Sequence, residues 1–269
     1  EFVNNEEEAP TTEVAVKKTE DWEKLNVLDP KKELREYIRC NEILARDLRR
    51  MPFIYTIPSP IVQAMNGVST TEQVLKDMKE NPDALRKGLT TITETTIDFA
   101  KACIDAGASG IFFGIGGGGR IWEVLNKKQL ETYALGYDKK VLDAVKTPIK
   151  FMHICSTPEG NPGKLMEERW FNKYPVTALN WASHSWTPLK KGKELYGGKY
   201  CICGGLDREE VLRKGTPKQV EDAVRKTIDE CADGGGFMLG PDCTVFQDTP
   251  RENYNAVGRA VWKYGAYKK

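Results

Sequence analysis

Residues 82–119 read PDALRKGLTTITETTIDFAKACIDAGASGIFFGIGGGG and contain one complete helix-to-strand unit. The stretch 82–106 has the composition and spacing of a helix, and Gly107 is the residue type that commonly follows a helix end. A short β-rich run at 110–113 comes next and leads directly into a run of glycines. The sequence therefore predicts a helix, a glycine cap and a strand that ends in a glycine loop.

The same alternation continues on both sides of this unit. Further strands are expected at 52–57, 149–155, 176–184, 200–203 and 236–240. Further helices are expected at 32–49, 70–79, 127–144, 164–173, 216–233 and 251–264. Strict alternation implies parallel strands joined by right-handed crossovers. The predicted class is therefore α/β, and the predicted fold is a TIM (β/α)₈ barrel with about six of its eight strands in this chain.

The strand count bears on domain organisation. No internal repeat or low-complexity linker divides the chain, so we expect a single barrel domain over residues 1–269. The acidic stretch 1–13 is expected to be a loop or a disordered start. Six strands would leave two open edges, so the natural polypeptide is expected to extend upstream by two strand–helix units, unless another chain covers the gap.

Composition excludes several classes of function. The chain has 40 Lys and Arg against 39 Asp and Glu, so it lacks the basic excess that nucleic acids or anionic membrane surfaces require. No apolar run approaches the roughly 20 residues of a membrane helix, and no signal peptide is visible. Seven cysteines, an odd number without a disulfide-scaffold pattern, fit a reducing cytosol. We expect a cytoplasmic protein that contacts neither nucleic acid nor membrane.

A candidate metal site lies at the predicted strand ends, where parallel barrels carry their active sites. His153 and Cys155 are two residues apart near the end of a strand, so their side chains share one face. Cys243 follows the last strand. An imidazole and two thiolates suit zinc, and three protein ligands leave a fourth position open, as in catalytic zinc sites.

Spacing alone leaves an alternative to this metal site. Buried histidines and cysteines are usually core residues, and two such residues can fall two apart by chance. Cys201 and Cys203 also share one face near the end of a strand, which makes them rival ligands, although core thiols are the simpler interpretation.

Further polar residues follow the predicted strands. His184 ends the strand at 176–184 and could be an acid–base group or a substrate contact, with a surface histidine as the alternative. Asp207 and Asp242 follow the last two strands and are candidate polar groups of a pocket. We therefore predict His184, Asp207 and Asp242 as catalytic residues.

A glycine loop and a tyrosine are the candidate cofactor contacts. Gly116, Gly117 and Gly118 lack the Gly-Lys-Ser/Thr of a P-loop, but such a loop could move or let a flat cofactor approach the backbone. An ordinary flexible loop is the alternative. Tyr55, expected at the end of the strand at 52–57, is a weaker candidate. Few cations lie near strand ends, which disfavours a tetrapyrrole with many carboxylates.

Several segments resemble the uroporphyrinogen decarboxylase superfamily, and together they span Val14 to Lys263. They are the stretch from Lys17 to Leu25 with Leu28-Asp29-Pro30, Ala106-Gly107-Ala108-Ser109-Gly110, Gly204-Gly205-Leu206-Asp207 and Thr249-Pro250-Arg251-Glu252-Asn253. The resemblance implies a TIM barrel whose first two strands lie upstream of every strand found here.

Within that superfamily, His153-Ile154-Cys155 with Cys243 is similar to the His-x-Cys…Cys zinc signature of the cobamide-dependent methyltransferases. True decarboxylases typically carry Gly-His-Gly where this chain has Gly240-Pro241-Asp242. The resemblance therefore implies Zn²⁺ and methyl transfer between a corrinoid (methylcobamide) and a small-molecule thiol or methyl donor. The corrinoid would be carried by a partner protein, and the direction of transfer stays open.

Two alternatives remain at this stage. One is cofactor-free decarboxylation of a porphyrinogen, as in uroporphyrinogen decarboxylase, and the other is a non-catalytic scaffold that binds a corrinoid protein. A homodimer is also an allowed assembly.

Overall fold

The structure is a computed structural model and describes residues 13–49 and 51–266. The expected loop at 1–13 lies outside the described residues except for Glu13.

Six strands form the sheet of the described chain, all of them at predicted positions. They are β1 (Ile54–Pro58), β2 (Gly110–Ile115), β3 (Ile149–Ile154), β4 (Ala178–Trp181), β5 (Cys201–Leu206) and β6 (Phe237–Pro241). Their order in the sheet follows the order in the chain, and the pairs β1–β2, β4–β5 and β5–β6 are parallel. The predicted strand at 176–184 is shorter than expected, so His184 lies in the turn after β4 and not in the strand.

Helices connect the strands, most of them where the sequence predicted. The predicted helices correspond to α1 (Pro30–Glu33) with α2 (Arg35–Leu48), α4 (Thr71–Glu80), α5 (Pro82–Asp105), α7 (Lys127–Leu130) with α8 (Gly136–Ala144), α9 (Gly163–Glu167), α11 (Pro217–Cys231) and α12 (Arg251–Tyr264). Gly107 follows α5 with a φ of 109°, a left-handed conformation that suits glycine.

Three predicted helices are interrupted, and several short ones were not predicted. The first is broken at Leu34, which is not helical and separates α1 from α2. In the second, a π-helical turn at Glu131–Leu135 separates α7 from α8. The third is broken at Arg169, which follows α9 with a φ of 54°. The unpredicted elements are η1 (Thr19–Lys24), α3 (Pro60–Met65), α6 (Arg120–Val124), α10 (Leu189–Tyr196) and η4 (Arg208–Arg213), whereas η3 (Trp170–Lys173) is the second part of the helix predicted at 164–173. All but α10 have six residues or fewer, too short to show a clear helical period.

The described residues fall into two compact units, with β3 shared between them. The first unit holds residues 13–152 and 173–177. Trp22 is fully buried there against α5, so close to Gly88 that a Cβ at that glycine would lie 2.2 Å from the indole ring. The indole Nε1 donates to Asp77 of α4 at 2.7 Å, which joins the segment before α1 to two helices.

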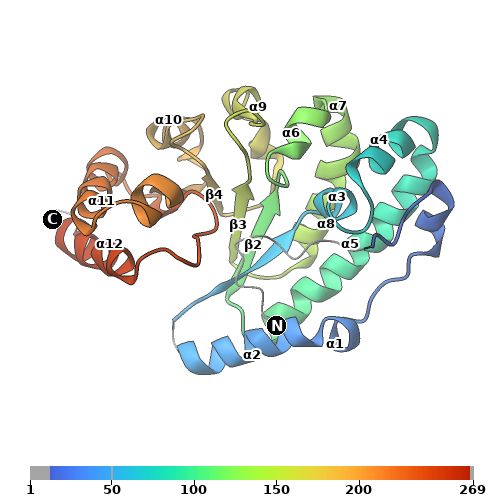
Figure 1. Cartoon of the computed structure of the whole chain (residues 1–269), viewed down its shortest axis with the longest axis horizontal. Coiled ribbons are helices and arrows are strands. Elements are labelled where there is room, and N and C mark those ends of the chain that lie inside the picture. Colours follow the sequence, from blue (N-terminus) through green and yellow to red (C-terminus); the bar gives the residue numbers. More distant parts are fainter. Residues whose placement is uncertain (1–12, 50, 267–269) are drawn as a thin grey trace. The chain divides into compact units, whose positions relative to one another are not determined.

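The second unit holds residues 153–172 and 178–266 and contains all of the predicted metal and catalytic residues. Helices α11 and α12 pack side by side in it (Figure 1), around a core formed by Leu206, Leu212, Val220, Val224, Ala256 and Ala260. Trp181 of β4 is fully buried against Gly192 of α10, where any larger residue would clash with the ring. This packing holds the end of β4, which the turn that carries His184 follows.

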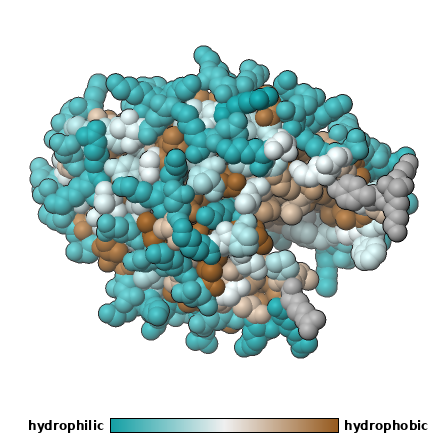
Figure 2. Space-filling view, turned by 180° about the vertical axis from the view of Figure 1, so that it is seen from behind, coloured by the Kyte–Doolittle hydropathy of each residue, from teal (hydrophilic) through white to brown (hydrophobic). Residues whose placement is uncertain are grey.

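The face of the molecule seen in Figure 2 is mostly hydrophilic. Hydrophobic side chains are scattered between the hydrophilic ones. Within the described part of the chain, no helix combines the length and the apolar character needed to cross a membrane.

Candidate functional site

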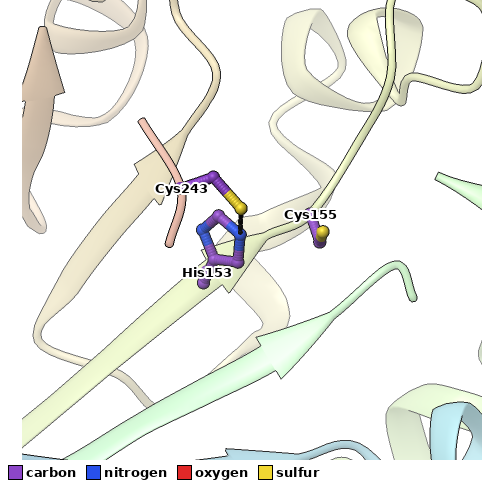
Figure 3. A group of neighbouring side chains, drawn as sticks. All are labelled: His153, Cys155 and Cys243. Atoms are coloured by element: carbon purple, nitrogen blue, oxygen red, sulfur yellow. Dashed lines mark hydrogen bonds between the residues drawn. The ribbon is translucent and has the colours of Figure 1, made fainter. Parts of the chain in front are cut away.

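Three side chains converge at the carboxyl ends of β3 and β6. His153 lies near the end of β3, Cys155 directly follows that strand, and Cys243 is the second residue after β6. Their ligand atoms all lie within 4.8 Å of one another, and the His153 Nε2 atom is 3.4 Å from the Cys243 sulfur. Figure 3 shows Cys243 reaching the imidazole from the loop after β6. The structure thus brings together the three residues that the sequence predicted as ligands.

The surroundings of Cys243 favour its thiolate. A hydrogen bond with the Cys155 thiol, assisted by the His153 ring and the charge of Arg208, lowers the pKa of Cys243 to about 3, although burial acts in the opposite direction. A thiolate is the form of cysteine that binds metal. The site is therefore prepared electrostatically to act as a ligand set.

The rival cysteines lie in a different environment. Cys201 and Cys203 belong to β5, and burial raises the pKa of both, that of Cys203 to about 12. A thiol that stays protonated is a poor ligand for zinc. Their environment agrees with the interpretation of these two residues as core thiols.

Asn180 is a site residue that the sequence analysis missed. It is 2% exposed in β4, and its Oδ1 atom lies 2.6 Å from His153 Nδ1. Its amide nitrogen donates to two backbone carbonyl oxygens, of Cys203 and Pro241. The available signal was its position in the run Ala178-Leu179-Asn180-Trp181, because a lone amide among apolar residues in a buried strand needs polar partners.

The donor set of the cysteine–histidine group fits Zn²⁺. One imidazole nitrogen and two sulfurs are preferred zinc ligands, and three protein ligands leave one tetrahedral position for a substrate. The atom of His153 that is not directed at the cysteines already has a hydrogen-bond partner in Asn180, as metal-binding histidines usually do. The residues present are therefore suited to hold the metal that the sequence pattern implied.

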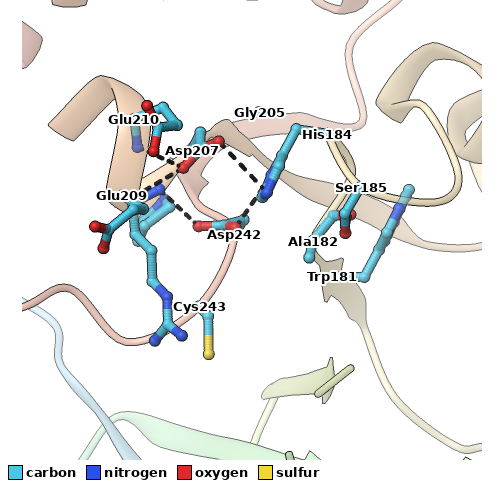
Figure 4. A network of polar contacts seen from close by, with 12 residues as sticks. Trp181, Ala182, His184, Ser185, Gly205, Asp207, Glu209, Glu210, Asp242 and Cys243 are labelled. Atoms are coloured by element: carbon cyan, nitrogen blue, oxygen red, sulfur yellow. Dashed lines mark hydrogen bonds and ion pairs between the residues drawn. The ribbon is translucent and has the colours of Figure 1, made fainter. Parts of the chain in front are cut away.

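The predicted catalytic residues form a second group, also at strand ends. Asp207 directly follows β5, Asp242 directly follows β6, and His184 lies in the turn after β4. The His184 ring lies between the two carboxylates, with Nε2 3.4 Å from Asp207 and Nδ1 3.1 Å from Asp242 (Figure 4). The structure brings all three together.

Each carboxylate of this group is fixed by its other oxygen. Asp207 Oδ1 accepts hydrogen bonds from the backbone N–H groups of Glu209 and Glu210, at the start of η4. Asp242 Oδ1 accepts from the backbone N–H of Arg208 at 2.9 Å. The free oxygens of both aspartates are therefore held toward His184.

The geometry suits proton handling better than metal binding. The two ring nitrogens point to different carboxylates, whereas a metal would need the three donors to converge on one point. A neutral imidazole has one N–H group, so satisfying both contacts requires an extra proton on the ring or on a carboxyl group. Burial raises the pKa of Asp242, which favours retention of a proton there.

The candidate cofactor contacts belong to the other unit. Gly116, Gly117 and Gly118 follow β2, and their φ angles of 101°, 53° and 67° are all in the left-handed region that favours glycine. Tyr55 differs from the prediction, because it is the second residue of β1 and does not lie at the strand's end. Its ring packs edge-on against Phe99 of α5, with centroids 5.9 Å apart. Tyr55 therefore packs against a helix and is not one of the strand-end residues.

Comparison with known proteins identifies relatives that match most of the chain. The family model described as uroporphyrinogen decarboxylase (URO-D) matches residues 1–264. The uroporphyrinogen decarboxylase of Syntrophotalea carbinolica is 24% identical over 252 residues, which cover 91% of this chain and 69% of that protein. The enzyme of the same name from Carboxydothermus hydrogenoformans is 25% identical over 260 residues, with 92% and 69% covered.

Solved structures show a similar fold at lower identity. A methyltransferase from Methanosarcina mazei superposes with a TM-score of 0.71 at 19% identity, covering 85% of this chain but 64% of that one. A B12-independent methionine synthase from a Shewanella species superposes with a TM-score of 0.60 at 13% identity, covering 84% and 67%. Together with the six strands, these likenesses confirm the predicted TIM-barrel class, and the chain spans about two thirds of the length of these proteins.

Proposed function

Because this chain belongs to the uroporphyrinogen decarboxylase family, we propose that it is a zinc-dependent methyltransferase. The methyl group would move between a corrinoid carried by a partner protein and a thiol or a methylated substrate. The observation that carries the proposal is the convergence of His153, Cys155 and Cys243, whose ligand atoms lie within 4.8 Å of one another. A family member that decarboxylates without a cofactor has no need for this ligand set.

The three ligands would hold Zn²⁺ and leave one position for the substrate. When bound, zinc supplies a Lewis acid that favours the deprotonated form of a thiol or polarises a methyl donor. The chain's own contribution is to keep its ligands deprotonated and oriented. The low pKa of Cys243 and the hydrogen bond between His153 and Asn180 both serve this purpose.

His184 and its two aspartates would handle the proton that a thiol substrate releases or that a leaving group takes up. The ring is 41% exposed, so it can exchange protons with solvent, while Asp242 is 3% exposed and anchored to the backbone. Asp242 is also the neighbour of Cys243 in the chain. The proton-handling group therefore adjoins the metal ligands through a single peptide bond.

Two comparisons support methyl transfer, although the second, which is B12-independent by name, does not support a corrinoid as the methyl carrier. The structural neighbour from Methanosarcina mazei is described as a methyltransferase, and the Shewanella neighbour as a B12-independent methionine synthase. A soluble partner that carries the corrinoid would supply or accept the methyl group. Gly116, Gly117 and Gly118 remain the candidate contacts for that flat cofactor, because a loop of successive left-handed glycines has no side chains to keep a cofactor from the backbone.

A second candidate, decarboxylation of a porphyrinogen, is favoured by the names of the curated relatives at 24–25% identity. One assay separates the candidates. The zinc-loaded protein is incubated with methylcobalamin and a small thiol, and in parallel with a porphyrinogen. Methylation of the thiol supports the proposal, whereas carbon dioxide release from the porphyrinogen alone would replace it. No turnover in either assay, by protein with zinc bound, would favour a non-catalytic scaffold for a corrinoid protein.

A further inference from the structure

The amide of Asn180 connects His153 to the backbone of two other strands, β5 and β6. We infer that Asn180 is the positioning residue that fixes which His153 nitrogen faces the two cysteines. The inference rests on the proposed function, which supplies the zinc, but the hydrogen bonds of Asn180 are formed by the chain without any metal. Asn180 is 2% exposed, and its three hydrogen-bond partners, His153, Cys203 and Pro241, lie within the second unit.

The orientation of the amide follows from its partners. Its nitrogen end lies 3.1 Å from the Cys203 carbonyl oxygen and 2.9 Å from that of Pro241. Carbonyl oxygens only accept hydrogen bonds, so the NH₂ group must face them and Oδ1 must face His153. The reverse orientation would place three acceptor oxygens together without a proton.

The proton on His153 follows in turn. Asn180 Oδ1 can only accept, and it lies 2.6 Å from Nδ1, so Nδ1 must carry a proton. In the neutral ring Nε2 then keeps its lone pair, and Nε2 is the atom 3.4 Å from the Cys243 sulfur. Asn180 thus orients the ring so that Nε2 faces the cysteines, and a metal that binds there would take the place of a proton shared between Nε2 and the Cys243 sulfur.

The same side chain also holds the second ligand-bearing segment. Pro241 ends β6 and precedes Cys243 by two residues, so the bond from Asn180 to its carbonyl restrains the loop that carries this cysteine. One buried amide therefore links the end of β3, which carries His153, to the middle of β5 and the end of β6. Removal of such an orienting residue typically weakens metal binding by about 10–100-fold.

Asn253 provides a matched control in the same unit. It is 1% exposed, and its amide nitrogen also donates to two backbone carbonyl oxygens, of Leu212 and Gly215, both at 2.8 Å. Its Oδ1 atom has no hydrogen-bond partner. Asn253→Ala therefore reproduces the loss of a buried amide that bonds two carbonyls, without touching a histidine.

The test reads the His153 tautomer and the metal affinity separately. The chain has two histidines, so long-range ¹H–¹⁵N spectra of the metal-free protein show the signals of two imidazole rings. The His184→Gln variant lacks one of them, which assigns the remaining signals to His153. We expect a proton on Nδ1 of His153 in the wild type. In Asn180→Ala, the neutral form protonated at Nε2 should appear, and zinc affinity should fall about 10–100-fold. Asn253→Ala should change neither.

Two results would overturn the inference. One is a wild-type His153 with a bare Nδ1, which needs no variant and decides the matter even if Asn180→Ala fails to fold. The other is an Asn180→Ala protein with the same tautomer and zinc affinity as Asn253→Ala. A wild type with the expected Nδ1 proton but no zinc binding would refute the proposed function and leave the role of Asn180 standing.

Discussion

Asp138 is a carboxyl group enclosed by hydroxyl groups, and its replacement by asparagine should make the protein more stable at high pH. Asp138 is 1% exposed in α8, where the Ser59 hydroxyl donates to it at 2.6 Å and the Tyr174 hydroxyl at 3.0 Å. Burial raises the pKa of Asp138 from 3.8 to about 7, although both hydroxyl groups act to lower it. The folded state therefore holds this proton more tightly than the unfolded chain does.

The sign of the effect follows from that difference. Because the pKa of Asp138 is raised in the folded state, its proton stabilises the folded protein fully below about pH 4. This stabilisation is lost as the pH rises through about 7. A difference of about 3 in pKa corresponds to about 4 kcal/mol. Asparagine has the same shape and no proton to lose. The free energy of unfolding of Asp138→Asn, minus that of the wild type, should therefore rise by about 4 kcal/mol between pH 4 and pH 8.

Asp77 provides the control for this experiment, since its environment shifts the pKa the other way. It is fully buried, and burial alone would raise its pKa, but hydrogen bonds from groups that include Thr19, Gln73 and Trp22 lower it below 3.8. Urea unfolding at several pH values measures the free energy of unfolding of the wild type and both variants. Asp77→Asn should be less stable than the wild type by an amount that stays constant above about pH 5. Parallel pH curves for the two variants would refute the reasoning.

Two further predictions concern the strand-end loops. His184→Ala should lower the rate of methyl transfer by about 100-fold or more, because the change removes the proton-handling ring. Zinc should stay bound, because His184 is not one of the proposed metal ligands. Turnover and metal content test this prediction, and loss of zinc would contradict it. Gly117→Ala should lower the free energy of unfolding by about 2–3 kcal/mol, because φ is 53° and a Cβ would lie 2.8 Å from the Asn66 amide. Gly118→Ala, with a φ of 67° and open space around it, should lower it by about 1 kcal/mol, and equal losses would contradict the packing argument.

Much of the fold was predictable because the strands are short apolar runs that alternate with amphipathic helices. The last helix, Arg251–Tyr264, coincides with its prediction, since a proline precedes it and a glycine follows it. The prediction failed where tertiary contacts decide local structure. The strand expected at 176–184 ends at Trp181, because Ala182 and the residues after it turn and the Trp181 indole donates to the carbonyl oxygen of Thr187 at 2.7 Å.

The sequence allowed prediction of those site residues whose side chains are of a type that binds metal. His153 and Cys155 stand out in the sequence because few side chains bind zinc and their spacing matches a strand. Asn180 could not be assigned this way, since its role depends on two backbone carbonyl groups from other strands. Tyr55 was misplaced because the strand begins at Ile54, later than the prediction, which moves the tyrosine to its start.

Zinc content per chain tests the central claim most directly. The wild type and the variants Cys155→Ser, Cys243→Ser, Cys201→Ser and Cys203→Ser are purified, loaded with zinc and dialysed, and their metal is measured together with a check of folding. Serine is a poor substitute for a thiolate ligand. We expect about one zinc per chain in the wild type and in the two β5 variants, and a sharp loss of zinc in Cys155→Ser and Cys243→Ser. Equal zinc content in all five proteins, or none in the folded wild type, would contradict the zinc site and the methyltransferase proposal with it.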